Sequence, residues 1–436
     1  MTTTTNTIMT HSKPSPFSKD HSKALRRLVL DLYREVLTRK QTLEDTCARH
    51  LTFARHEPVD RGFVMLRLKT LFRYRGAFGA MIRDFSPKKT EHEDVLHLAL
   101  TEILCLGTPV YAAAQWAKSV TKPYAQSYVH ALIQRAVRLG PNWRDVYAAP
   151  ERIMPSWLYQ RLHEQYAPEI LRAMTHVGLQ TPPLDITLSG QGAAGEGGHP
   201  FLVPWSYRYA ESPSVTALSG YDQGLWWVQD VAASFPVMGL GDVRGKTVLD
   251  MGAAPGGKTM QLASRGAHVT ALDYAPERIK ILKDNLARTG LPAEVVAADA
   301  LTWSPPALFD AVLLDAPCSA TGTLRRHPEL PWIRDGKHIG ALRVTQEALL
   351  HRALNAVSVG GRVVYAVCSL LKEEGEDVVQ AVLGARSDCL LRPMTNQDTM
   401  IPDFALKDGY LQTNPSHWAE AGGMDGFFAA CLVKTS

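Results

Sequence analysis

The 436-residue chain has little cysteine and no long apolar run. Its six cysteines are widely spaced, at Cys47, Cys105, Cys318, Cys368, Cys389 and Cys431. None forms a C-x-x-C pair, so the sequence favours neither a zinc site nor a disulfide framework. No apolar stretch is long enough to cross a bilayer. The opening MTTTTNTIMTHSKPSPFSKD also lacks the apolar region of a secretory signal. We therefore expect no bound metal, no membrane association and a reducing, cytoplasmic location.

Acidic residues are scarce in the first third of the chain. Residues 1–140 carry 22 Lys and Arg against 12 Asp and Glu, a net charge of +10, whereas the remainder carries 25 against 31, a net of −6. A basic part joined to a mildly acidic part indicates an anion-binding module fused to something else. A solvated helical surface would have the same charge, so charge alone leaves both interpretations open.

Two patterns of apolar residues divide the chain. Residues 20–140 repeat apolar side chains at helical spacing, as in SKALRRLVLDLYREVL, which predicts a helical bundle. From about Lys246, short apolar runs such as TVLDMG, HVTALD and FDAVLLDAP alternate with helical patterns, the β-α-β rhythm of a mostly parallel sheet covered by helices on both faces. We expect a disordered tail over 1–19, a helical domain over 20–145, a helical or irregular linker subdomain over 146–235, and an α/β domain over 236–436.

The loop GAAPGGKT, residues 252–259, matches the phosphate-loop pattern G-x-x-x-x-G-K-[ST]. Asp250, just before it, would repel phosphates and attract a cation, and Pro255 lacks a backbone N–H that could cradle phosphate. Asp273 and Asp299 end the next two strands, so three acids should line one edge of the sheet. They suit a ligand with a ribose, an amino group and a sulfonium, namely S-adenosylmethionine, better than ATP. Helix capping is the alternative for each acid alone.

Two Cys-Ser pairs follow apolar strands. Cys318 lies in LLDAPCSATGTLRRHPE and Cys368 in VVYAVCSLLKEEGE. Ligands of this architecture bind beyond the carboxyl ends of the strands, where both pairs should lie. Buried structural cysteines are the alternative, but the polar loops that follow favour exposure.

Together with GLWWVQDVAA, AAPGGKT and the closing GGMDGFFAACL, these motifs resemble the RsmB/Fmu/Sun branch of the Sun-type RNA cytosine-5 methyltransferases. The resemblance covers nearly everything after the first ~20 residues, which fit a disordered tail. It implies an α/β, Rossmann-like S-adenosylmethionine-dependent methyltransferase domain preceded by an all-α NusB-like RNA-binding domain. It further implies S-adenosylmethionine as cofactor and a cytosine of 16S (small-subunit) rRNA as target, modified to 5-methylcytosine by a monomer.

The resemblance also assigns roles to single residues. Cys368 would be the nucleophile that adds to carbon 6 of cytosine, Cys318 would assist product release, and Asp315 would contact N3 and the exocyclic amine. The implied cofactor contacts are Asp250, Gly252, Ala253, Ala254, Pro255, Gly256, Gly257, Lys258, Asp273, Arg278, Asp299 and Asp315. The sequence departs from the family at three positions: Gly252 stands where many members have Cys, Val367 where Thr is usual, and Gly375 where Asn is common.

Four arginines are candidate RNA contacts. Arg73 and Arg75 alternate with aromatic residues in RLKTLFRYRGAF, and Arg325 and Arg326 follow the Cys318 motif. A wet basic helix face is the alternative for the first pair. Three other functions stay open at this point: a methyltransferase of tRNA or DNA, a P-loop ATPase joined to an RNA-binding bundle, and a non-catalytic NusB-like RNA-binding factor.

Overall fold

A computed structural model describes residues 18–86, 90–190, 195–210 and 213–436. The chain forms two compact units, each described by itself below. The first comprises Met1–Tyr159 with His327–Arg334, and the second Gln160–Arg326 with Asp335–Ser436. Residues 1–17 of the expected tail lie outside the described residues, and Ser18 caps the first helix by accepting a hydrogen bond from the His21 N–H.

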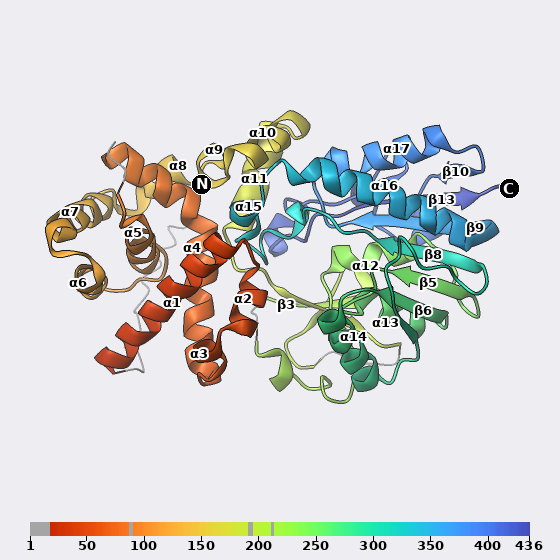
Figure 1. Cartoon of the computed structure of the whole chain (residues 1–436), viewed down its shortest axis with the longest axis horizontal. Helices are drawn as coiled ribbons and strands as arrows, with labels where there is room; N and C mark the ends of the chain where they lie inside the picture. The colour runs from red at the N-terminus through yellow and green to blue at the C-terminus, as the bar shows by residue number, and fades with distance from the viewer. Residues whose placement is uncertain (1–17, 87–89, 191–194, 211–212) are drawn as a thin grey trace, which may run out of the picture. The chain divides into compact units, whose positions relative to one another are not determined.

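The first unit is helical and is built around one long buried helix, α4 (Figure 1). α4 starts with Pro58 in its first turn, where a missing N–H costs nothing, and runs to Phe85. The helices of this unit are α1 (Lys19–Arg39), α2 (Leu43–Arg49), α3 (Leu51–Ala54), α4 (Pro58–Phe85), α5 (Glu93–Leu100), α6 (Val110–Val120), α7 (Gln126–Val137), α8 (Trp143–Tyr147), α9 (Pro150–Ile153) and α15 (Leu330–Ile333). A π-helical turn, Thr101–Cys105, extends α5.

The short helix α15 comes from far along the sequence. The Trp332 indole N–H donates to the carbonyl of Phe72, and the Arg75 guanidinium lies 4.7 Å from the Trp332 ring. The buried carboxylate of Glu329 accepts from the backbone N–H of Leu43. The segment 327–334 is thus packed among α1, α2 and α4 of the helical unit.

A small antiparallel sheet opens the second unit, after α10 (Ser156–Gln165) and α11 (Pro168–Gly178). Its strand order is β2-β3-β1-β4. The strands are β1 (Leu184–Leu188), β2 (His199–Phe201), β3 (Val203–Tyr209) and β4 (Trp226–Val228). The expectation of a helical or irregular linker over 146–235 is therefore corrected. The helical unit continues past 145 to Tyr159, and residues 184–228 include a sheet within the second unit.

The main sheet has the order β11-β12-β13-β9-β8-β5-β6-β7, with β10 paired to β13. β9, β8, β5, β6 and β7 run parallel, and β13 lies antiparallel to β9. The strands are β5 (Thr247–Met251), β6 (His268–Asp273), β7 (Glu294–Ala297), β8 (Phe309–Asp315), β9 (Val357–Val367), β10 (Cys389–Arg392), β11 (Leu406–Lys407), β12 (Tyr410–Gln412) and β13 (Phe428–Lys434).

Helices cover both faces of this sheet (Figure 1). The helices are α12 (Val231–Met238), α13 (Gly257–Ser264), α14 (Pro276–Thr289), α16 (His338–Ala356), α17 (Glu376–Ala385) and α18 (Asn396–Thr399). α12 packs on one face, where Phe235 and Val364 share an apolar core, and α16 packs on the other, where Leu350 meets Tyr365. The strands are apolar nearly throughout because both of their faces are buried. The carboxyl ends of the parallel strands meet at one edge, where the loops that carry the candidate residues begin.

Candidate active site

The glycine-rich loop connects β5 to α13. Gly252 has φ +81°, and a Cβ built there would lie 2.4 Å from the carbonyl oxygen of Asp315. Gly256 has φ +109° and caps α13. The N–H groups of Gly252 and Ala253 donate to the Leu272 carbonyl at the end of β6, at 2.9 and 3.1 Å. In this backbone, a side chain at Gly252 would need both a left-handed conformation and space that the end of β8 occupies.

Asp250 is fully buried below this loop. One carboxylate oxygen accepts from the Thr259 hydroxyl at 2.6 Å, whereas the other, Oδ1, has no partner among the described residues. Burial raises the pKa of Asp250 to about 7; the Thr259 hydrogen bond and the charge of Lys258 oppose this rise. An unpartnered buried carboxylate oxygen is costly unless a ligand or a proton satisfies it.

Asp273 ends β6 and is buried beside the same loop. Its two oxygens accept from the N–H groups of Ala254 and Ala275, both at 3.1 Å. Arg278 lies on α14, half exposed, with its guanidinium 3.6 Å from the Asp273 carboxylate and hydrogen-bonded to the Ala254 carbonyl. Asp273 and Arg278 thus hold the glycine-rich loop in place through hydrogen bonds with the backbone N–H and carbonyl of Ala254.

Asp299 follows β7 and is exposed. Its carboxylate accepts from the Leu301 N–H at 2.9 Å, which closes a local turn. No helix starts at Asp299, since β8 is the next element, so the helix-capping alternative is not observed there and the side chain faces solvent.

Lys258 and Asp315 form an ion pair between α13 and the end of β8. The ammonium nitrogen lies 2.7 Å from the carboxylate, and the lysine side chain is 10% exposed. Burial lowers the pKa of Lys258, but Asp315, Asp250 and Cys368 raise it more, so the net direction is upward. Lys258 therefore stays charged and supplies positive potential next to the two cysteines.

The two motif cysteines are in contact. Their sulfur atoms, from the loop after β8 and the end of β9, lie 3.4 Å apart, and both residues are half-buried. The hydrogen bond to Cys368 and then burial raise the pKa of Cys318 well above its usual range. Cys318 therefore keeps its proton over the usual pH range.

Sequence reasoning missed the residue that joins the two Cys-Ser turns. Glu374 is fully buried, and its carboxylate accepts hydrogen bonds from the hydroxyls of Ser319 and Ser369, at 2.5 and 2.6 Å. The only signal for it was an acid in LLKEEGE, six residues after Cys368. Charged residues in a loop usually belong to a solvated turn, and no neighbouring residue in the sequence indicated that Glu374 is buried.

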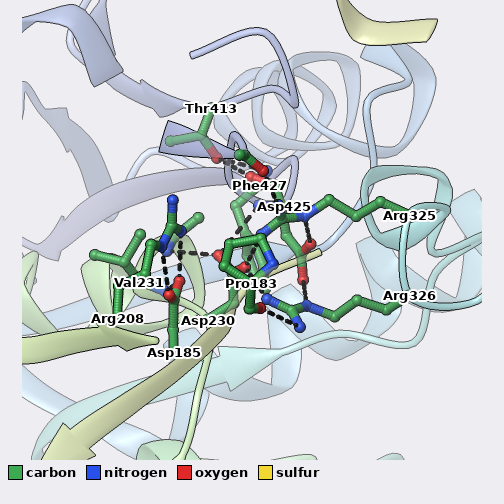
Figure 2. Close-up of polar contacts among 12 residues, drawn as sticks. Pro183, Asp185, Arg208, Asp230, Val231, Arg325, Arg326, Thr413, Asp425 and Phe427 are labelled. Atoms are coloured by element: carbon green, nitrogen blue, oxygen red, sulfur yellow. Dashed lines mark hydrogen bonds and ion pairs between the residues drawn. The ribbon is translucent and has the colours of Figure 1, made fainter. Parts of the chain in front are cut away.

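Arg325 and Arg326, predicted RNA contacts, belong instead to an internal network (Figure 2). The Arg325 side chain is 0% exposed and donates to Asp425 at 2.6 Å and to Asp230. Arg326 donates to the same two carboxylates, at 3.1 and 2.6 Å, and is 23% exposed. Burial alone would raise the pKa of Asp230, but the two arginines hold it below its usual range. We therefore withdraw Arg325 from the RNA contacts, because its donors face carboxylates that are equally buried.

Asp185 and Arg208 continue this network into the small sheet. The Arg208 guanidinium binds the Asp185 carboxylate through two nitrogens, at 2.6 and 2.7 Å, and that carboxylate also accepts from the Val231 N–H (Figure 2). The small sheet and the start of α12 are thus tied to the chain that follows Cys318.

Arg73 and Arg75 also lie within the fold. Arg73 is buried on α4, and burial lowers its pKa to about 10. Arg75 donates to the Tyr33 hydroxyl at 2.8 Å and stacks on Trp332. These two arginines therefore lie against the helical core. This corrects the prediction that Arg73 and Arg75 form an RNA-facing surface.

Two searches of the described residues gave negative results. No group of three or more His, Cys, Asp or Glu in the described part of the chain could hold a metal ion. No helix in the described ranges is long and apolar enough to cross a membrane.

Comparison with known proteins decides the family. Residues 237–433 match the family described as 16S rRNA methyltransferase RsmB/F. Ribosomal RNA small subunit methyltransferase B of Citrobacter koseri is 32% identical over 377 residues, and that of an Enterobacter species is 31% identical over 378; each alignment covers 81% of this chain and 85% of the relative. The chain belongs to the RsmB/F family of 16S rRNA methyltransferases.

A solved structure supports the fold of this RsmB/F member. The crystal structure of PH0851 has a TM-score of 0.72 and covers 94% of this chain and 98% of its own, at 22% identity, a level that shows the fold alone. The predicted family, the Rossmann-like methyltransferase fold with a NusB-like helical region, the methyltransferase activity and S-adenosylmethionine as cofactor are confirmed. The individual roles of the site residues stay predictions.

Proposed function

We propose that this chain methylates carbon 5 of a cytosine in small-subunit rRNA through a covalent bond between Cys368 and carbon 6 of the base. One observation carries the proposal: the Cys318 and Cys368 sulfur atoms are 3.4 Å apart, at the sheet edge that also holds Asp315 and Lys258. Relatives called small subunit rRNA methyltransferase B support the choice of RNA.

The residues of the glycine-rich loop fit S-adenosylmethionine. Asp250 Oδ1, buried without a partner among the described residues, suits a positively charged group. Gly252 and Gly256 keep the loop free of side chains, and Asp273 offers its carboxylate at the end of β6. When bound, S-adenosylmethionine supplies the methyl group.

Cys368 and Asp315 make carbon 5 reactive in this proposal. Carbon 5 of cytosine is a poor nucleophile, so the Cys368 sulfur forms a bond to carbon 6 and the carbon 5–carbon 6 electron pair becomes available at carbon 5. Asp315 holds N3 and the exocyclic amine, where charge changes as the adduct forms. The ion pair with Lys258 holds the Asp315 carboxylate in place.

Cys318 completes the reaction. Once carbon 5 carries the methyl group, its proton must leave and the bond between carbon 6 and the Cys368 sulfur must break. Cys318 gives its proton to the departing sulfur, 3.4 Å away, and its own sulfur then takes the proton from carbon 5. The half-buried position of both thiols requires the target base to leave its stack before it is reached.

The helical unit supplies the RNA contacts in this proposal. Its exposed guanidiniums include those of Arg27, Arg49, Arg55 and Arg61, from α1, α2, the end of α3 and α4. They replace Arg73 and Arg325 as candidates because they face solvent, where phosphates can reach them.

The deciding experiment traps the covalent intermediate. Wild type, Cys318→Ala and Cys368→Ala are mixed with S-adenosylmethionine and either deproteinised small-subunit rRNA or tRNA, and then separated on denaturing gels. We expect Cys318→Ala alone to form a denaturant-resistant adduct, and to form it on rRNA, because release is blocked after the sulfur–carbon bond forms.

Other outcomes assign other functions. An adduct on tRNA alone would move the substrate class and leave the chemistry intact. An adduct with Cys368→Ala but not with Cys318→Ala would exchange the two roles. No adduct and no methyl transfer on either RNA, with folded protein, would refute the two-cysteine mechanism and favour a non-catalytic RNA-binding protein.

A further inference from the structure

Glu374 occupies a position that the chemistry above does not use. It ends the short turn Lys372–Glu374 after β9 and has no exposed surface. Its Oε1 accepts from the Ser319 N–H at 2.8 Å and from the Gln346 amide at 3.2 Å, while Oε2 accepts from the Ser319 and Ser369 hydroxyls at 2.5 and 2.6 Å. A buried carboxylate with no arginine or lysine bonded to it among the described residues is expensive, so four donors are gathered to hold it.

Three of the four donors belong to the residues that follow the two cysteines, and the fourth, Gln346, lies on α16. Ser319 is next to Cys318, and Ser369 is next to Cys368. The two turns are also bonded to each other: the Gly322 N–H donates to the Cys368 carbonyl at 2.9 Å, and the Leu370 N–H donates to the Thr321 hydroxyl at 3.0 Å. The separation of the two sulfur atoms is therefore set by a cross-linked pair of turns with one carboxylate at its centre.

We propose that Glu374 is a positioning residue for the reaction: its carboxylate holds Ser319 and Ser369, and through them it keeps the two thiols in contact with the proton on Cys318. The proposal rests on the proposed cytosine chemistry, which needs one sulfur as nucleophile and the other as proton donor. Glu374 bonds the two serines directly, and in this proposal it acts on the sulfurs through them and through its charge.

The charges around the pair support this division of roles. The hydrogen bond to Cys368 and burial raise the pKa of Cys318 most, the Glu374 carboxylate adds to the rise, and the Ala320 backbone opposes it. The buried Tyr365 hydroxyl donates to the Glu374 carbonyl, and burial raises the pKa of this phenol, so it stays neutral. Lys258 lies on the other side, paired with Asp315 and within range of the Cys368 charge. Negative charge thus acts on Cys318, and positive charge acts near Cys368.

A test must separate this role from simple space filling. Glu374→Gln keeps the shape but removes the charge and replaces one acceptor by a donor that faces the two serine hydroxyls. The matched control is Glu373→Gln, one residue earlier, where a part-exposed carboxylate pairs with Arg161 at 3.1 Å. A second variant, Ser319→Ala with Ser369→Ala, removes the two hydroxyl donors while leaving Glu374 unchanged.

The readout is the alkylation of each cysteine in the free, full-length protein. Iodoacetamide labelling is followed by peptide mass spectrometry from about pH 6 to about pH 10, a range that spans ordinary thiol ionisation. In wild type and Glu373→Gln we expect Cys368 to react at lower pH than Cys318. In Glu374→Gln the labelling of Cys318 at the alkaline end of this range should rise, and the selectivity for Cys368 should shrink.

Steady-state methylation adds a second readout. We expect Glu374→Gln to lower kcat by about 10- to 100-fold with KM for RNA little changed, because the sulfur atoms lose their alignment while the RNA surface does not change. Folded Glu374→Gln with wild-type labelling and kcat would overturn the proposal. If Glu374→Gln does not fold, unchanged labelling in the folded double serine variant would overturn it instead. Labelling needs no RNA. A result that refutes the Glu374 proposal can therefore be distinguished from one that refutes the covalent mechanism.

Discussion

At the scale of single residues, Asp250 is the carboxyl through which we expect pH to affect cofactor binding. Its carboxyl is neutral below about pH 7 in the free protein, because burial raises its pKa to about 7. A bound cation favours the ionised form, so binding below that pH must release a proton. We expect the affinity for S-adenosylmethionine to fall by up to about tenfold for each pH unit below about 7 and to level off above it. Isothermal titration in buffers of different ionisation enthalpy measures both the affinity and the proton count.

The control for this prediction is a pair of variants. Asp250→Asn should bind the cofactor more weakly with an affinity that no longer changes across this range, since it has no proton to release. Glu294→Gln, an exposed position on β7, should behave as wild type. A wild-type affinity that is flat between about pH 6 and about pH 8 would contradict the prediction.

At Gly252 the backbone opposes any side chain. Its φ of +81° disfavours any side chain by about 1–2 kcal/mol, and the Asp315 carbonyl lies 2.4 Å from a Cβ placed there. We expect Gly252→Ala to lower the free energy of unfolding by about 2 kcal/mol or more and to weaken cofactor binding. Urea unfolding with and without S-adenosylmethionine measures both effects.

Gly290 provides the comparison for Gly252. It also has a positive φ, +64°, but a Cβ there would meet nothing within 4 Å. Gly290→Ala should therefore show the backbone cost alone, with cofactor binding unchanged. Equal losses of cofactor affinity at Gly252 and Gly290 would show that the contact with Asp315 is unimportant.

At the scale of elements, the segment 327–334 is a piece of the catalytic half of the sequence that folds with the helical unit. The half-buried Trp332 bonds the Phe72 carbonyl and supports the Arg75 guanidinium. We expect Trp332→Ala to cost about 2 kcal/mol, roughly half of what a fully buried tryptophan costs, and to loosen α1, α2 and α4. Hydrogen–deuterium exchange of peptides from these helices measures the loosening. Leu308→Ala, exposed in the second unit, is the control, and equal exchange in both variants would contradict the prediction.

The elements also show where the sequence was informative. The parallel strands and the loops after β5, β8 and β9 could be predicted because each strand is a short apolar run that ends at an acid or a Cys-Ser pair. The basic residues of α4 were wrongly predicted to face RNA. A helix buried on most sides can pair its arginines with acids inside the unit, as Arg67 does with the buried Glu102 at 2.7 Å. The small sheet was missed because its strands are short and separated by Gly-rich loops.

Glu374 and the Arg325–Asp230–Asp425 cluster could not be predicted for another reason. Each joins residues that lie 50 or more positions apart in the sequence, such as Ser319 with Glu374 and Arg325 with Asp230. Periodicity and spacing report only on neighbours along the chain, so a charge whose partners come from distant loops looks like an exposed charge.

At the scale of the whole molecule, charge is divided between the two parts of the sequence. The buried cluster of Arg26, Arg67 and Glu102 accounts for only +1 of the net +10 of residues 1–140, and cations such as Arg27 and Arg61 are exposed. Phosphate contacts release counterions, so affinity for RNA should fall steeply with salt.

This division gives the last prediction. We expect Arg27→Glu with Arg61→Glu to lower the affinity for small-subunit rRNA by about tenfold at about 100 mM KCl and to reduce the slope of log affinity against log salt by about 1–2. Lys280→Glu with Lys283→Glu, exposed on α14, reverses the same number of charges and should change both quantities less. Filter binding between about 50 and about 200 mM KCl measures them. Equal effects of the two double variants would mean that net charge alone attracts the RNA, and that the helical unit has no dedicated surface for it.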